Sequence, residues 1–141
     1  MAYQGYFKPK NPKKYKGDPT NIVYRSGWEL KLMLFLDERP DVIQWSSEEL
    51  RIPYISPIDG KRHTYFPDFW IKKADGTVTI VEVKPAFQTT EPKKQSKITK
   101  KYIREVTEYG KNQAKWKAAD EYCKDRGWKF QIFTEQELGI K

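Results

Sequence analysis

Two charged side chains stand two residues apart in an otherwise apolar run of the sequence. The run reads TVTIVEVK, and its charged members are Glu82 and Lys84. Residues two apart on a β-strand point to the same face, so the carboxylate and the ammonium group are expected side by side. Burying either charge alone would cost several kcal/mol, so each of them needs partners.

A second carboxylate, Asp68, precedes Glu82 by 14 positions and lies in the motif FPDFW. Between them is the turn sequence ADG, whose centre is near Asp75 and Gly76. If the two runs form a hairpin about this turn, Asp68 falls opposite Glu82 or Val83 on the neighbouring strand. Two carboxylates would then converge beside one lysine.

Two oxygen donors at this separation suit Mg²⁺, which binds through one or two carboxylates and keeps several water ligands. Such an ion can polarise a phosphodiester and lower the pKa of a bound water molecule. Lys84 could orient that water or neutralise charge that develops in the transition state. The alternative is structural: Glu82 and Lys84 form an ordinary ion pair, and Asp68 caps a turn. Spacing alone leaves both explanations open.

A third carboxylate, Glu29, lies in a predicted helix that begins after Ser26 and ends before Pro40. Four apolar residues recur there at helical spacing on one side: Trp28, Leu32, Phe35 and Leu36. Ser26 is a suitable N-cap, and Glu29 has the offset of a capping box. Glu29 is therefore either a helix-capping residue or part of the same acidic site.

Three runs rich in β-branched and aromatic residues follow this helix, at residues 41–57, 61–73 and 77–85. Turn sequences separate them, so they predict an antiparallel meander. The third run is apolar at nearly every position through Val83, which indicates a central strand covered on both faces. A polar loop, a helix as far as Arg126 and a last strand at residues 128–134 complete the prediction. The expected class is α/β, with a mixed central sheet flanked by helices.

Residues 1–20 form a separate segment in this interpretation, and residues 21–141 form a single domain. The segment has no apolar periodicity and is interrupted by prolines, so an extended basic arm is expected. Its aromatic residues are candidates for stacking on unpaired bases or for packing against a partner subunit. The aromatic residues are Tyr3, Tyr6, Phe7 and Tyr15, and the basic residues of the arm are Lys8, Lys10, Lys13, Lys14 and Lys16.

The composition favours a polyanionic partner. The chain has 27 Lys and Arg against 19 Asp and Glu, a formal net charge of +8. It contains no apolar run of the roughly 20 residues that span a bilayer, and its start lacks the apolar region of a signal peptide. Membrane proteins and secreted proteins are therefore disfavoured. The single cysteine, Cys123, is expected to be a free thiol in a reducing cytosol.

The acidic residues and the elements that carry them resemble a known pattern. Pro67 and Asp68, then 13 residues, then Glu82 to Lys84, after a helix with Glu29, resemble the PD-(D/E)XK nuclease superfamily. The order of helix, three strands, helix and strand is that of its restriction-endonuclease-like core. The motifs YRSGWE, QWSSEE and YFPDF are similar to those of the small head-completion nucleases of tailed phages and, more distantly, of TnsA-type transposon endonucleases.

The resemblance implies a metal-dependent DNA endonuclease that uses Mg²⁺, with Mn²⁺ as a substitute. Asp68 and Glu82 would be metal ligands, Lys84 the catalytic lysine, and Glu29 an acid that assists the metal or its water. Such a protein would process DNA ends during head completion after packaging, in the host cytoplasm or in the virion. Its partners would be DNA and head or portal proteins, and assembly into a homo-oligomer is left open. The alternative is a structural head-completion protein that keeps the fold with little turnover.

Six basic residues without an intervening acid follow the proposed site and are predicted to contact DNA phosphates. They are Lys93, Lys94, Lys97, Lys100, Lys101 and Arg104. Gln113 matches a glutamine that some nuclease branches use, although those branches have a tyrosine four residues later, where this chain has Lys117. His63, the only histidine, lies on the strand that leads to Asp68 and is a candidate for approaching the scissile phosphate.

Overall fold

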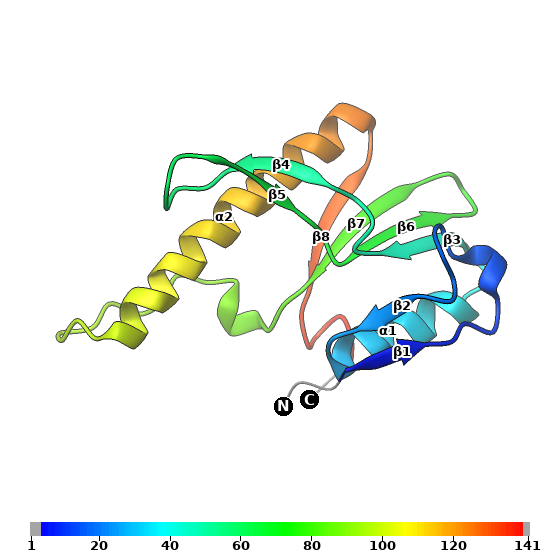
Figure 1. Ribbon diagram of the computed structural model, residues 1–141, viewed down its shortest axis with the longest axis horizontal. Helices are drawn as coiled ribbons and strands as arrows, with labels where there is room; N and C mark the ends of the chain where they lie inside the picture. Colours follow the sequence, from blue (N-terminus) through cyan, green and yellow to red (C-terminus); the bar gives the residue numbers. More distant parts are fainter. Residues whose placement is uncertain (1–3, 140–141) are drawn as a thin grey trace.

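A four-stranded mixed sheet forms the centre of the computed structural model, which describes residues 4–139. Three neighbouring strands are antiparallel, and the fourth runs parallel to the third. In spatial order they are β3 (Val42–Ser47), β6 (Phe69–Lys73), β7 (Val78–Val83) and β8 (Lys129–Phe133). The predicted α/β class with a mixed central sheet is confirmed (Figure 1).

Two helices cover opposite faces of this sheet, α1 (Gly27–Glu38) and α2 (Lys100–Arg126). Phe69 and Val81 pack with Leu36 of α1 in one core cluster, whereas Ile80 packs with Cys123 of α2 in another. This division follows from the alternation of side chains along each strand. Figure 1 shows α1 and α2 on either side of the sheet.

β7 is an inner strand, as its sequence predicts. Ile80 and Val81 point to opposite faces and are both fully buried. Since each face of the sheet is covered by a helix, apolar side chains are stable on both sides of this strand. Glu82 is the first position at which a charged side chain enters this buried run.

The start of α1 and the end of α2 lie where the local sequence predicts. Ser26 accepts a hydrogen bond from Glu29 N at 3.2 Å at the start of α1. At the end of α2, Gly127 has φ +71°, and its N–H donates back to the last turn. Neither helix in residues 4–139 has an apolar stretch long enough to cross a membrane.

The first two predicted strand runs are each interrupted, and this differs from the expected simple meander. The run from residue 41 divides into β3 and β4 (Ile52–Ile55), and the run from residue 61 divides into β5 (Arg62–Tyr65) and β6. β4 and β5 form a separate two-stranded sheet, and β4 packs on α2. Glu48 has φ +55° at the first break, and Pro67, which has no N–H for a ladder, lies at the second.

The N-terminal segment packs on the domain, with β1 (Gly5–Phe7) paired to β2 (Ile22–Tyr24) and a short η1 turn (Pro12–Lys14). Phe7 and Tyr15 are buried, with ring centroids 5.8 and 4.8 Å from that of Trp45. These two rings therefore contribute to the core of their own chain, whereas Tyr6 is exposed. The expectation that the arm's rings serve bases or a partner is thus wrong for Phe7 and Tyr15, because Trp45 offers them an apolar site. Tyr3 lies outside the described residues.

Candidate active site

Asp68 and Glu82 lie level with each other at one end of β6 and β7. Phe69 pairs with Val81, so one further step along this register brings Asp68 opposite Glu82. Asp68 Oδ2 also accepts a hydrogen bond from Val83 N at 2.8 Å. The placement of Asp68 predicted from the turn is therefore confirmed.

Glu82 is buried, and its two carboxylate oxygens have different neighbours. Its Oε1 accepts a hydrogen bond from the Tyr65 hydroxyl at 2.8 Å, and its Oε2 lies 3.9 Å from Lys84 Nζ. Lys84 keeps 29% of its side chain exposed, whereas Glu82 keeps only 8%. Glu82 and Lys84 do share a face, but the long separation makes a tight structural ion pair a poor reason for burying this carboxylate.

Both acidic side chains have a raised pKa, and for both the largest cause is burial. Burial, and next the charge of Glu82, hold the pKa of Asp68 well above its usual range, and the charge of Glu29 adds to this rise. Burial also raises the pKa of Glu82, while the Tyr65 hydroxyl and Lys84 act in the opposite direction. Without a cation between them, two such carboxylates cannot both be ionised at low cost. The pair is therefore suited to a shared proton or a divalent cation.

Glu29 stands at the start of α1, where it closes the helix cap. Its Oε1 accepts from Arg25 N at 3.4 Å, and its Oε2 accepts from Ser26 Oγ at 3.3 Å. Burial raises the pKa of Glu29, and this residue is close enough to Asp68 to raise the Asp68 pKa. The capping role weighed from sequence is thus realised, and Glu29 also borders the acidic pair.

No three acidic, histidine or cysteine side chains within residues 4–139 form a group that could hold a metal ion. Asp68 and Glu82 are the carboxylates in closest register, and Glu29 is engaged by backbone and serine donors. Two carboxylates are sufficient for Mg²⁺, which retains water ligands. The residues present therefore fit a cation held by Asp68 and Glu82, and ligation by Glu29 stays a prediction.

Two residues that sequence patterns did not single out as site residues adjoin Glu82. Tyr65, at the end of β5, donates its hydroxyl proton to this carboxylate and is itself buried. Lys115 of α2 has its Nζ 5.8 Å from the Tyr65 ring centroid. Burial lowers the pKa of Lys115, and the charge of Glu82 counters this. No local pattern identifies these residues, because a separate hairpin and a distant helix bring them to β7.

Glu48 is a further residue beside the site. Its left-handed backbone is unusual for a residue other than glycine, and its N–H donates to the Asp68 carbonyl oxygen at 3.1 Å. The Glu48 carboxylate accepts from Arg25 Nε at 3.2 Å to each oxygen. The bend at Glu48 thus links the end of β3 to the residue that carries the Asp68 carboxylate.

The two accessory candidates lie apart from the acidic pair. His63 Nε2 is 2.8 Å from Asp59 Oδ2 in an exposed pair, and Gln113 is exposed on α2. Within the described part of the chain, neither side chain forms a hydrogen bond or an ion pair with Asp68 or Glu82. On α2 it is Asn112 and Trp116 that are buried, so the helix turns Gln113 away from the sheet.

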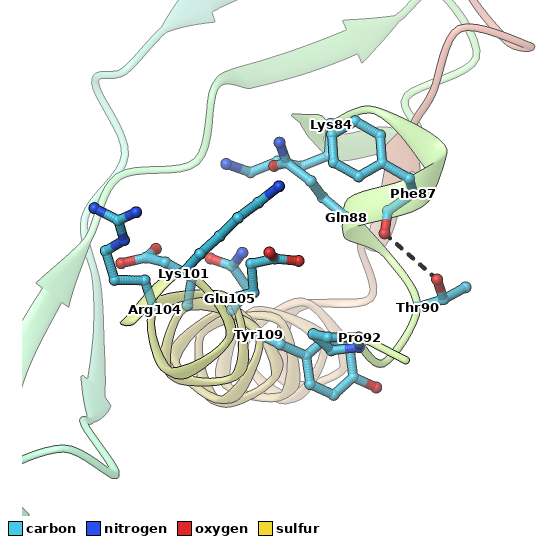
Figure 2. Close-up of a pocket in the computed structure, with 11 residues that line it drawn as sticks. Lys84, Phe87, Gln88, Thr90, Pro92, Lys101, Arg104, Glu105 and Tyr109 are labelled. Atoms are coloured by element: carbon cyan, nitrogen blue, oxygen red, sulfur yellow. Dashed lines mark hydrogen bonds between the residues drawn. The ribbon is translucent and has the colours of Figure 1, made fainter. Parts of the chain in front are cut away.

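A cleft of about 580 Å³ opens beside Lys84. Its walls are the η2 turn (Ala86–Gln88) and the first half of α2, as Figure 2 shows. Lys101 and Arg104 of the predicted DNA-contacting run line it. The remaining residues of that run are exposed nearby: Lys93, Lys94, Lys97 and Lys100.

Comparison with known proteins agrees with this arrangement. Residues 39–135 match the family model described as TnsA-like endonuclease N terminal, a range that contains Asp68, Glu82 and Lys84. The chain is also 42% identical over 142 residues to the "Head completion nuclease" of Enterobacteria phage T4, covering 98% of this chain and 95% of that protein. This chain therefore belongs to the TnsA-like endonuclease N-terminal family.

Proposed function

We propose that this protein is a metal-dependent DNA endonuclease that processes DNA ends during completion of phage heads after packaging. The observation that carries the proposal is that Asp68 lies in register with the buried Glu82, which shares a face of β7 with Lys84. The name of the phage T4 relative supports the biological setting. The partners proposed are DNA and head or portal proteins, in the infected cell or in the virion.

Asp68 and Glu82 would hold the cation, Mg²⁺ or Mn²⁺, because their oxygens are hard donors and their like charges favour a divalent ion between them. When bound, the ion would supply Lewis-acid chemistry at the phosphodiester. The residues' own geometry supports this assignment. Val83 N and Tyr65 Oη each orient one of the carboxylates, as supporting groups commonly do around metal ligands.

Lys84 and Glu29, both close enough to act on Asp68 electrostatically, would act on the substrate and its attacking water. Lys84 is partly exposed toward the cleft, so its ammonium group can neutralise charge that develops on the phosphate. The raised pKa of Glu29 suits a group that takes up the proton of the attacking water. Lys101 and Arg104 would hold the phosphates of the strand that enters the cleft.

The first test is DNA cleavage. Purified protein is expected to nick supercoiled plasmid in Mg²⁺ or Mn²⁺ and to be inactive with a chelator. Glu82→Ala is expected to reduce the rate by at least about a hundredfold, because it removes one ligand and leaves the charge of Lys84 unbalanced.

Glu121→Ala, at an exposed position of α2, is the matched control and should cut at the normal rate. Thermal unfolding of each variant checks that the fold is intact. Cleavage by Glu82→Ala at the rate of the parent protein would contradict the proposal. A parent protein that cuts no DNA would instead favour a structural role in head completion.

A further inference from the structure

The cleft beside Lys84 contains a feature that phosphate binding does not explain. Asn112 of α2 lines it, and this residue is only 7% exposed. Within residues 4–139 its side-chain amide makes no hydrogen bond. Neither its amide nitrogen nor its amide oxygen is among the fully buried unpaired atoms of the described residues, so the free amide is open to the cleft. The amide presents one acceptor and two donor protons, so it suits a ligand edge that carries both kinds of group.

An exposed aromatic ring lies on the opposite wall. Phe87 in η2 is 74% exposed and follows Lys84 by three residues. Figure 2 shows its ring beside Lys84, with Lys101 reaching across from α2. An apolar ring left open at the mouth of a cleft is a suitable platform for a nucleic-acid base, since every base has a π-face.

The charges along the cleft distinguish a base from a phosphate. Lys101 and Arg104 lie toward the start of α2, whereas Glu105 and Glu108 also line the cleft. The two carboxylates repel a phosphate, but they can accept hydrogen bonds from the exocyclic amino groups of bases. The cleft volume of about 580 Å³ is within the roughly 300–1,000 Å³ typical of small-ligand sites.

From these observations we infer that the cleft binds one unpaired nucleotide next to the scissile phosphate, with its base on Phe87 and its edge at Asn112. A base inside a continuous duplex cannot reach this position, because its partner and its stacked neighbours occupy the same faces. The preferred substrate is therefore DNA with an unpaired strand that adjoins a duplex, such as a frayed end or a flap. This inference rests on the proposed nuclease function, because Lys84 belongs to both the cleft and the site.

Binding can be measured without cleavage, in the absence of divalent metal. Two DNAs carry the fluorescent base 2-aminopurine, one in a short flap next to a duplex and one paired inside a duplex of equal length. The protein is expected to quench the flap label and to bind the flap DNA at least about tenfold more tightly than the duplex. Equal affinity for the two DNAs would overturn the inference.

Phe87→Ala is the main variant, because the ring is on the surface and its loss should not affect folding. It is expected to abolish the quenching and to weaken flap binding about tenfold, with duplex binding unchanged. Phe35→Ala removes a ring that is 52% exposed on α1 and is the matched control. Unaltered quenching by Phe87→Ala would also overturn the inference.

Asn112→Leu keeps the approximate size of the side chain but removes its amide, and Gln113→Leu is its exposed neighbour and control. Flap binding is expected to fall severalfold in the Asn112→Leu variant only.

Failure of this inference can be distinguished from failure of the proposed nuclease function. If Glu82→Ala abolishes cleavage but no flap preference exists, only this inference fails; if Glu82→Ala cuts normally, the proposed function fails whatever the preference.

Discussion

At the scale of single residues, the main feature is a carboxylate pair whose burial opposes its ionisation. Asp68 and Glu82 both have raised pKa values because they are buried, and the charge of Glu82 raises that of Asp68 further. Such an arrangement costs folding stability in the metal-free protein and is typical of sites arranged for chemistry.

This cost has a predictable dependence on pH. A carboxyl group whose pKa is raised in the folded state keeps its proton while the unfolded chain loses its own, so stability falls as pH rises from about 4 through the folded pKa. Asp68→Asn is expected to remove much of this decline and to stabilise the metal-free protein at neutral pH, on the order of 1 kcal/mol.

Denaturant unfolding at a series of pH values measures this effect. The same experiment can be repeated with Mn²⁺ at a concentration one hundred times the Kd of the protein for this ion. Mn²⁺ should then raise the free energy of unfolding of the parent protein by about 2.7 kcal/mol and leave that of Asp68→Asn unchanged. Identical dependence of stability on pH in the two proteins would show that folding does not raise the pKa of Asp68.

At the scale of elements, the N-terminal segment is attached to the end of α1. Lys14 Nζ donates to the carbonyl oxygens of Leu36, Asp37 and Arg39 at 2.8, 2.9 and 2.8 Å. These are the groups that a helix leaves unsatisfied at its C-terminus, where a positive charge is also favourable. This lysine, expected to belong to a basic arm, therefore stabilises a helix end.

Lys14→Met keeps most of the side chain but removes the donors. We expect it to lower the free energy of unfolding by about 1–3 kcal/mol, because charge-assisted hydrogen bonds to three carbonyl groups are lost. Lys13→Met, an exposed neighbour in the same η1 turn, should change stability by less than about 0.5 kcal/mol. Chemical denaturation distinguishes the two variants, and equal losses would show that Lys14 does not act as a cap.

At the scale of the whole molecule, a run of six basic residues lies next to the cleft that Lys84 lines. All the buried residues of α2 lie from Asn112 onward, so its first half projects beyond the sheet (Figure 1). That half and the loop before it carry the predicted phosphate contacts, next to the cleft that Lys84 lines. The long helix thus sets the basic run beside the proposed reaction centre.

DNA binding is therefore expected to depend on salt through this end of the molecule. Replacing Lys97, Lys100 and Lys101 by alanine should reduce the slope of log affinity against log salt by roughly two to three, because each lost phosphate contact contributes about 0.9 on duplex DNA. A matched triple variant at the opposite end of the sheet, of Lys73, Lys124 and Lys129, should keep the parent slope. Titrations at several salt concentrations check this, and equal slopes for the two triple variants would exclude the basic run as the binding surface.

Much of the acidic site could be predicted from the sequence because its geometry is local. Alternation along β7 places Glu82 and Lys84 on one face, and the centre of a single turn sets Asp68 opposite Glu82. Ser26 and Glu29 form a cap within one helical turn. Each of these relations spans one turn or one strand pair, so residue spacing is enough to determine it.

Other parts of the site were decided only by tertiary packing. Successive residues of an α-helix differ by about 100° around its axis, so the burial of Trp116 and Asn112 turns Gln113 outward. Tyr65 reaches Glu82 from the β4–β5 hairpin, which is a sheet separate from the one that carries Glu82. The sequence alone thus determined which residues could carry the chemistry on β7 and its neighbour. The rotation of α2 and the position of the inserted hairpin, which depend on long-range packing, decided which other side chains surround them.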